Sequence, residues 1–224
     1  MNRVYHWVRR VMLARKARLV KHNSRLNQGS LLDIGTGTGY FPHFMQERGW
    51  HVSAIEKSPQ ARQFAKEHFE LDVAAPEALN EFANKSFDVI TLWHVMEHLE
   101  HLNETWETLK RILKDQGILI IAVPNPTSFD AEKYKEMWGA YDVPRHLWHF
   151  SPSVMQQFGA KHDFILCERH PMPFDAFYVS MLSEKYRKSA FPFIKGLITG
   201  AEAWIVSLAK KDRSSSMIYV FRKK

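Results

Sequence analysis

Cysteine is almost absent from this 224-residue chain. Its single cysteine, Cys167, excludes an internal disulfide and lies in an apolar run, so we expect a buried core thiol and not a nucleophile. No apolar segment with the length of a signal-peptide core follows the first charges, which argues against a secretory signal. These absences lead us to expect a cytoplasmic protein.

Acidic residues are missing from the first 25 positions, where eight of the 31 lysines and arginines lie. The remaining residues carry 23 basic and 24 acidic side chains, so the net charge of +7 belongs to this N-terminal arm. We expect residues 1–25 to form a basic helix that packs beside the site or stays partly solvated. Docking on anionic lipid, RNA or an acidic partner, and organellar targeting, are the alternatives.

Strand-like and helix-like patterns alternate along much of the chain. Alternation of this kind predicts an α/β fold around a parallel sheet with right-handed crossovers. The strand-like runs are residues 31–34, 51–55, 71–74 (the weakest), 87–92, 118–123, 164–168 and 217–221. The helix-like runs are residues 41–48, 59–69, 103–113 and 152–159, and residues 114–117 are typical of a turn.

Two segments interrupt this alternation, and we expect them to form a helical and aromatic cap. Residues 124–150 are rich in aromatic side chains, and residues 170–215 contain an amphipathic helix at about 190–209. Lys195 and Glu202 lie within that helix, which argues against a transmembrane span. We expect its apolar face to pack on the domain, with an interfacial membrane helix, and hence peripheral membrane contact, as the second interpretation.

The most informative stretch is LLDIGTGTGYF, at residues 31–41. Its glycines, Gly35, Gly37 and Gly39, follow a strand and precede a helix, which is how α/β folds hold nucleotide-like ligands. The third glycine comes one residue earlier than in the dinucleotide fingerprint, and Asp33 would oppose a pyrophosphate but suit a cationic ligand. Glu56 ends the second strand, where an acid accepts hydrogen bonds from a ribose diol.

With these motifs, the chain resembles the class I S-adenosylmethionine-dependent methyltransferases. The resemblance also rests on AIEKS around Glu56, on KSFDVITLWHVMEHL and on LKRILKDQGILIIAVPNP. The later DVPRHLWHFSP narrows it to a small-molecule branch similar to quinone-biosynthesis O-methyltransferases. The resemblance implies a Rossmann-like seven-stranded sheet in the order 3-2-1-4-5-7-6, with strand 7 antiparallel and helices on both faces. Residues 26–224 would form this domain, after the arm.

The resemblance also implies S-adenosyl-L-methionine as the cofactor and S-adenosyl-L-homocysteine as the product. Asp33 and the glycine loop would hold the methionine part, Glu56 the ribose, and Lys57 with the 75–77 loop would flank the adenine. Trp93 and His94 would close over the cofactor. The expected cofactor-binding residues are Asp33, Gly35, Thr36, Gly37, Gly39, Glu56, Lys57, Ala75, Glu77, Trp93 and His94.

Two histidines in the loop beyond the fifth strand are the candidate catalytic residues. Methyl transfer to a hydroxyl requires a base with a pKa near neutrality, which indicates histidine. His146 is the first candidate and His149 the second, with lid packing as the alternative role for both. The aromatic residues of the cap favour an apolar or aromatic small-molecule acceptor and O-methylation.

Three alternatives accompany this prediction. The sequence HVMEH, at residues 94–98, fits an inverted zinc-protease motif, but His94 ends a strand and no third ligand is evident, so we expect no metal. A methyltransferase acting on RNA or protein through the basic arm is a second hypothesis, although the tetrad typical of base-amine methyltransferases is missing after the fourth strand. A non-catalytic module that only binds S-adenosylmethionine is the third.

Overall fold

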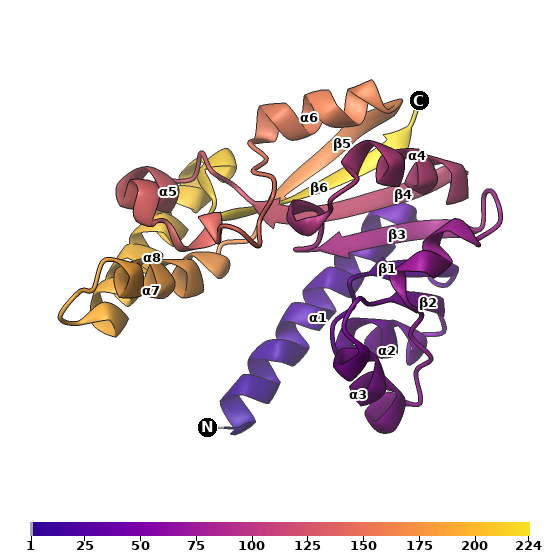
Figure 1. Ribbon diagram of the computed structural model, residues 1–224, viewed down its shortest axis with the longest axis horizontal. Coiled ribbons are helices and arrows are strands. Elements are labelled where there is room, and N and C mark those ends of the chain that lie inside the picture. The colour runs from indigo at the N-terminus through magenta and orange to yellow at the C-terminus, as the bar shows by residue number, and fades with distance from the viewer. Residues whose placement is uncertain (1) are drawn as a thin grey trace. The chain divides into compact units, whose positions relative to one another are not determined.

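The computed structural model describes residues 2–224, and side chains from His6 onward. The chain forms two compact units. Of the described residues, the first holds 2–93, Asn103–Ile120 and Lys223, and the second holds His94–Leu102, Ile121–Arg222 and Lys224. The strands of this α/β fold form a six-stranded sheet in the order β2-β1-β3-β4-β6-β5 (Figure 1).

The first unit is built around β1, which is parallel to both of its neighbours. Leu31 and Leu32 in this strand are fully buried, because helices cover a central parallel strand on both faces. The unit contains α1 (Asn2–Ser24), β1 (Ser30–Ile34), α2 (Tyr40–Gln46), β2 (His51–Ile55), α3 (Pro59–Phe69), η1 (Pro76–Asn80), β3 (Phe87–Trp93), α4 (Leu102–Ile112) and the start of β4 (Leu113–Pro124).

The expectation of seven strands is wrong for the described residues. Residues 71–74, expected to form an edge strand, make one isolated parallel bridge between Ala74 and Ile55. Ala74 donates to the carbonyl of Ala54 and accepts from the amide of Glu56. Pro76 begins η1 immediately afterwards and cannot donate to a ladder, so pairing ends after these two bonds.

The turn expected at residues 114–117 is also wrong, because β4 begins directly at Leu113. Lys114 and Asp115 lie on this strand and form ion pairs with Asp88 (2.8 Å) and Lys85 (2.7 Å) respectively. These polar residues therefore belong to the solvent-facing start of a strand, a pattern that resembles a turn in sequence.

Helix α1 is anchored in the first unit. Ala17 and Val20 are buried, and Lys16 lies 4.3 Å from the ring centroid of Trp93. Near its N-terminal end, the guanidinium of Arg9 stacks 3.7 Å from the ring centroid of Tyr40. Within the predicted arm, Asn2–Ser24 are helical, and the C-terminal half of this helix contributes to a core.

The second unit ends in an antiparallel pair of strands. The amide of Met172 donates to Ser216, and the amide of Lys224 donates to Asp163, so the strands run in opposite directions. The unit contains η2 (Met96–His98), the end of β4, α5 (Phe129–Tyr134), η3 (Lys135–Met137), η4 (Gly139–Tyr141), α6 (Pro152–Lys161), β5 (Phe164–Pro171), α7 (Asp175–Tyr186), α8 (Pro192–Ala209), η5 (Lys211–Arg213) and β6 (Ser216–Lys223).

Cys167 is exposed, so the prediction of a buried thiol is wrong. The strand β5 alternates between buried and outward residues, and Ile165, two positions earlier, is half-exposed. Cys167 therefore shares the outward face of the strand.

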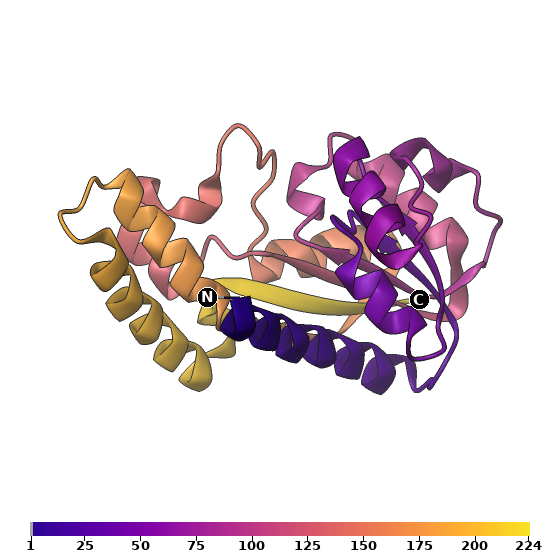
Figure 2. The same cartoon turned by 90° about the horizontal axis from the view of Figure 1, so that it is seen from below.

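The cap segments form a helical cluster with its own core. Tyr134 and Trp138 pack with Ala131, Ala140 and Val179. Helices α7 and α8 lie side by side, close to α5 (Figures 1 and 2).

Helix α8 packs through the face opposite to the one we expected. Its buried residues are Gly196, Thr199, Gly200, Ala203 and Ser207. Added Cβ atoms at Gly196 and Gly200 would lie 2.6 Å and 2.7 Å from backbone atoms of α7, so the two helices meet backbone to backbone. The large apolar side chains, expected to be buried, are exposed by 37–65%: Phe193, Ile194, Leu197, Ile198, Trp204, Ile205 and Leu208. Every helix among residues 2–224 is nonetheless too short or too polar to cross a bilayer.

Candidate active site

The glycine loop between β1 and α2 depends on left-handed backbone. Gly35, Gly37 and Gly39 have φ angles of 69°, 57° and 82°, which disfavour any side chain. A Cβ at Gly39 would lie 2.9 Å from Cβ of Ala65 in α3, so this glycine allows close helix packing. A Cβ at Gly37 would meet nothing within 4 Å. The middle of the loop therefore borders open space.

Asp33 lies at the end of β1 and is only 2% exposed. Burial raises the pKa of its carboxyl to about 6, although the hydroxyl of Thr91 donates to Oδ1 (2.5 Å) and opposes the rise. At neutral pH the group is mostly ionised, so it places a negative charge beside the loop. Such a charge favours a cationic ligand over a pyrophosphate, as expected from the sequence.

Glu56 connects the ends of β1 and β2. Its Oε2 accepts from the amide of Gly37 (2.7 Å), and its Oε1 accepts from the amide of Ser58 (2.8 Å). A carboxylate oxygen can accept two hydrogen bonds, so each retains capacity for one more. The residue predicted to bind a ribose diol thus has the remaining acceptors to do so, while it also holds the loop.

The other predicted cofactor residues in the first unit lie in varied surroundings. Lys57 and Glu77 are exposed, and Ala75, which is half-buried, precedes η1. Trp93 is only 9% exposed and meets Phe41 edge to face, at 5.6 Å between ring centroids. Trp93 therefore packs beneath the residues of α1 and α2.

His94, the first residue after β3, has a φ of 57° and lies between two carboxylates. Its Nδ1 is 3.4 Å from Glu97 and its Nε2 is 3.1 Å from Asp175. Desolvation disfavours the charged ring, but the two carboxylates outweigh it and raise the pKa of His94 to about 10. The residue is thus a fixed cation in the second unit.

The two candidate catalytic histidines lie in the loop between η4 and α6. Nδ1 of His146 is 2.8 Å from the carbonyl of Ala140, and Nε2 of His149 is 3.1 Å from the carbonyl of Tyr141. A carbonyl can only accept, so these nitrogens carry protons and each neutral ring keeps one basic nitrogen. Burial lowers the pKa of His146.

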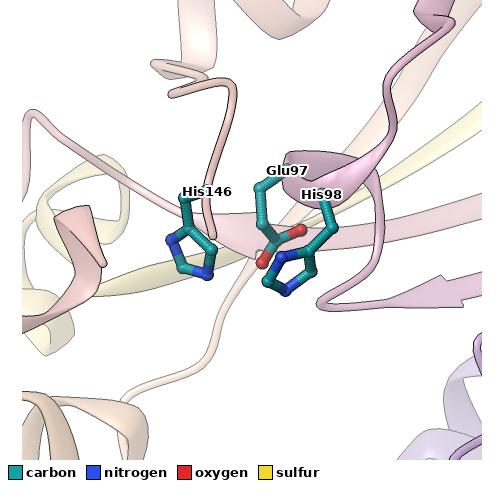
Figure 3. Close-up of side chains that lie close together, drawn as sticks. All are labelled: Glu97, His98 and His146. Atoms are coloured by element: carbon teal, nitrogen blue, oxygen red, sulfur yellow. The ribbon is translucent and has the colours of Figure 1, made fainter. Parts of the chain in front are cut away.

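A buried carboxylate and two imidazoles converge near this loop. Glu97, His98 and His146 each offer a ligand atom, and these atoms all lie within 4.8 Å of one another. Figure 3 shows the three side chains close together. His146 is therefore the third potential ligand that the HVMEH motif alone did not reveal.

Three residues with clear roles were missed from the sequence. Thr91 binds Asp33, Lys16 covers Trp93, and Asp175 pairs with His94. Thr91 could have been found, since parallel pairing of β1 with β3 places it opposite Asp33. Asp175 carries no such signal, because only the tertiary fold brings it to His94.

Comparison with known proteins identifies the domain. A family model described as a methyltransferase domain matches residues 4–167. An uncharacterized methyltransferase of Staphylococcus carnosus is 32% identical over 111 residues, which cover 49% of this chain and 52% of the relative. The mitochondrial ubiquinone biosynthesis O-methyltransferase of Schizosaccharomyces pombe is 27% identical over 135 residues, covering 56% and 49%. The chain spans about half the length of these curated relatives.

Solved structures agree on the fold. A SAM-dependent methyltransferase from Archaeoglobus fulgidus superposes with a TM-score of 0.62 at 19% identity, covering 96% of this chain and 94% of that one. At this identity the likeness establishes the fold alone. The family model covers well over half of the chain, including the glycine loop, Glu56 and the HVMEH segment. The chain therefore belongs to the methyltransferase-domain family.

Proposed function

We propose that this chain transfers the methyl group of S-adenosylmethionine to a hydroxyl of an apolar or aromatic small molecule. The observation that carries the proposal is the pair of carboxylates, Asp33 and Glu56, on either side of a glycine loop that borders open space. This donor set suits a ligand with an ammonium group and a ribose diol. The likeness to a ubiquinone biosynthesis O-methyltransferase supports a hydroxyl acceptor.

The residues present fit this cofactor. Ionised Asp33 would attract the ammonium and sulfonium charges, the Gly37 backbone would permit close approach, and Glu56 would accept from the ribose. We propose that Gly35, Thr36 and Gly39 shape the methionine site, and that Lys57, Ala75 and Glu77 border the adenine. Trp93 and His94 would close the site, with Trp93 supplying apolar surface and His94 fixed charge.

S-adenosylmethionine supplies an electrophilic methyl group on a sulfonium. The protein must then exclude water, align the acceptor and remove its proton. We propose that Nε2 of His146 accepts the hydroxyl proton while the acceptor oxygen bonds to the methyl carbon and the C–S electron pair returns to sulfur. His149, whose basic nitrogen is Nδ1, is the second candidate for this role.

The test combines binding with turnover. S-adenosylmethionine and S-adenosylhomocysteine should each raise the melting temperature, and NAD should leave it unchanged. Quinol and catechol acceptors should become methylated, as seen by mass spectrometry. Calorimetry that detects neither sulfur ligand would contradict the proposal, and binding without any turnover would favour a non-catalytic module.

His146→Ala should reduce turnover at least a hundredfold and leave the affinity for S-adenosylhomocysteine unchanged, as general-base catalysis typically contributes about 10²–10⁴ in rate. His101→Ala, an exposed histidine in the 94–102 segment, serves as the control and should retain turnover. A variant that lost affinity but not rate would remove His146 from the catalytic role.

We also propose that α8 contacts an anionic membrane surface, where an apolar acceptor would be dissolved. Helix α8 is amphipathic. Its small-residue face packs on α7, and its large apolar side chains are exposed on the opposite face. Residues 185–211 carry six basic side chains against one acid, Glu202, and that acid pairs with Lys133. An apolar face surrounded by positive charge is typical of helices that lie in a lipid interface.

Vesicle sedimentation tests this surface. Ile198→Glu/Ile205→Glu should abolish binding to vesicles that contain phosphatidylglycerol, because two charges would enter the apolar interface. The matched control is Gln156→Glu/Gln157→Glu, which places the same charges on exposed positions of α6 and should bind normally. A stable dimer without vesicle binding would assign the face to a second copy of the chain instead.

A further inference from the structure

We infer that Glu97, His98 and His146 form a binding site for a first-row divalent metal ion. The ligand atoms lie within 4.8 Å of one another, and Figure 3 shows the three side chains close together. Ligands at about 2.0–2.2 Å from one ion lie about 3–3.5 Å apart, so a modest closure suffices. His98 is exposed and His146 only partly covered, which leaves their rings room for this movement.

Both imidazoles already have the protonation state that a metal requires. Nδ1 of His98 donates to the carbonyl of Arg145 (2.9 Å), and Nδ1 of His146 donates to the carbonyl of Ala140 (2.8 Å). The remaining nitrogen of each neutral ring, Nε2, therefore carries a lone pair. A ligating histidine almost always has its other ring nitrogen bonded in this way, which fixes the tautomer and orients the ring.

Glu97 supplies a buried carboxylate that has an ion-pair neighbour, His94, at 3.4 Å. Its side chain is 1% exposed, and within residues 2–224 neither oxygen accepts a hydrogen bond. A buried carboxylate is costly unless it is paired or ligates a metal. Nδ1 of His94 makes the contact with Glu97, while its Nε2 lies 3.1 Å from Asp175. The carboxylate of Glu97 is therefore placed to ligate an ion together with His98 and His146.

The backbone holds the ligands together. The amide of Leu147 donates to the carbonyl of Glu97 (2.8 Å), which ties the segment after His146 to the residue before His98. The rings of His98 and His146 meet edge to face, with centroids 4.6 Å apart. The site therefore does not depend on a chance approach of long side chains.

The ligand types indicate the class of ion. Two imidazoles and one carboxylate suit Mn²⁺, Fe²⁺, Co²⁺ or Zn²⁺, whereas Mg²⁺ and Ca²⁺ prefer oxygen ligands. Three protein ligands leave coordination positions for an acceptor molecule. In this arrangement the ion, and not the imidazole of His146, would lower the pKa of the acceptor hydroxyl. That role rests on the proposed function, while binding of the ion does not.

Titration of the chelator-treated protein with Co²⁺ and Zn²⁺ tests the site directly. We expect one ion to bind per chain. Calorimetry and the visible absorption of Co²⁺ measure this binding. Glu97→Gln and His98→Ala should each weaken binding at least tenfold, and His101→Ala should not. Equal affinity in all four proteins, or no binding by the parent, would overturn the inference. Circular dichroism checks that each variant folds. If one fails to fold, His98→Gln is tested in its place.

Turnover with and without a chelator separates this inference from the proposed function. We expect chelation to reduce methyl transfer at least tenfold and to leave S-adenosylhomocysteine affinity unchanged, with activity restored by Zn²⁺ or Mn²⁺. Full turnover in the chelator would overturn the catalytic role of the ion and return His146 to the role of base. Absence of S-adenosylhomocysteine binding in both conditions would contradict the proposed function instead.

Discussion

Asp33 combines two requirements that oppose each other. Binding of the cationic ligand proposed above would require its charge, whereas burial in the strand makes that charge costly. The pKa of about 6 records the balance between desolvation and the hydroxyl of Thr91. The ligand-free protein is therefore less stable than it would be with a neutral group here.

Asp33→Asn should stabilise the ligand-free protein by about 1–3 kcal/mol at pH 7.5, and should abolish binding of S-adenosylmethionine. The folded-state pKa of about 6 lies above the unfolded value of 3.8, so the native protein binds the proton more tightly, and its stability falls as the pH rises from 3.8 to about 6 and levels off above that. The gain should shrink between pH 6 and pH 4. Urea unfolding at several pH values measures it; a variant less stable than the parent at pH 7.5 would contradict this account.

Gly37 and Gly39 form a matched pair for separating ligand binding from stability. Gly39→Ala should cost about 1–3 kcal/mol, because its φ of 82° and the contact with Ala65 both oppose a methyl group. Gly37→Ala places its methyl in open space, so it should cost about 1 kcal/mol through backbone strain and weaken S-adenosylhomocysteine binding much more. Urea unfolding and calorimetry on both variants check the contrast. Similar affinities in the two would argue against the ligand lying over Gly37.

At the scale of elements, periodicity predicted helices and strands better than it predicted their buried faces. Residues 59–69 form the helix expected of them, since Ser58 caps its first turn and Pro59 begins it. The large apolar side chains of α8 share one face of the helix, as predicted, but that face is exposed. A helical period shows which residues share a face, and only the contact of Gly196 and Gly200 with α7 shows which face is buried.

Part of the candidate site could likewise be predicted from the sequence, and part required the structure. Asp33, the glycine loop and Glu56 lie at or near strand ends, where sequence patterns are informative, and the structure places them together. His94, Glu97 and His98 are close in sequence, so a motif could reveal them. Their partners Asp175 and His146 come from distant segments, so their role requires the tertiary fold.

Gly200→Val should destabilise the protein by about 1–3 kcal/mol, because the added carbon atoms would collide with the backbone of Phe177. Ile198→Ser, two positions away on the exposed face, should change stability by no more than about 0.5 kcal/mol. Thermal unfolding of both variants without lipid compares them. A larger loss for Ile198→Ser would mean that the apolar face is covered in solution.

At the scale of the whole molecule, the basic arm contributes both buried apolar side chains and exposed positive charge. Its exposed basic residues include Arg10, Arg18 and Lys21, while Ala17 and Val20 on the same helix are buried. The charge and the packing can therefore be changed separately. Binding to RNA or an acidic partner would depend on the exposed positions alone.

Deletion of residues 1–25 should lower the stability by at least about 2 kcal/mol, because Val20 leaves the core and Trp93 loses its cover. Arg10→Glu/Arg18→Glu/Lys21→Glu should leave stability and S-adenosylhomocysteine affinity nearly unchanged. Denaturant unfolding and calorimetry compare the two variants with the parent protein. A truncated protein of unaltered stability would show that α1 is not part of the core.

The carboxylate of Glu56 gives the chain a mechanical link between two loops. One oxygen holds the amide of Gly37 and the other holds the amide of Ser58, so neither loop can open without loosening the other. Their amide protons should therefore exchange with solvent deuterium at similar slow rates. In Glu56→Gln one of the two acceptors becomes a donor, and the protection of one loop should fall while the shared opening motion is lost.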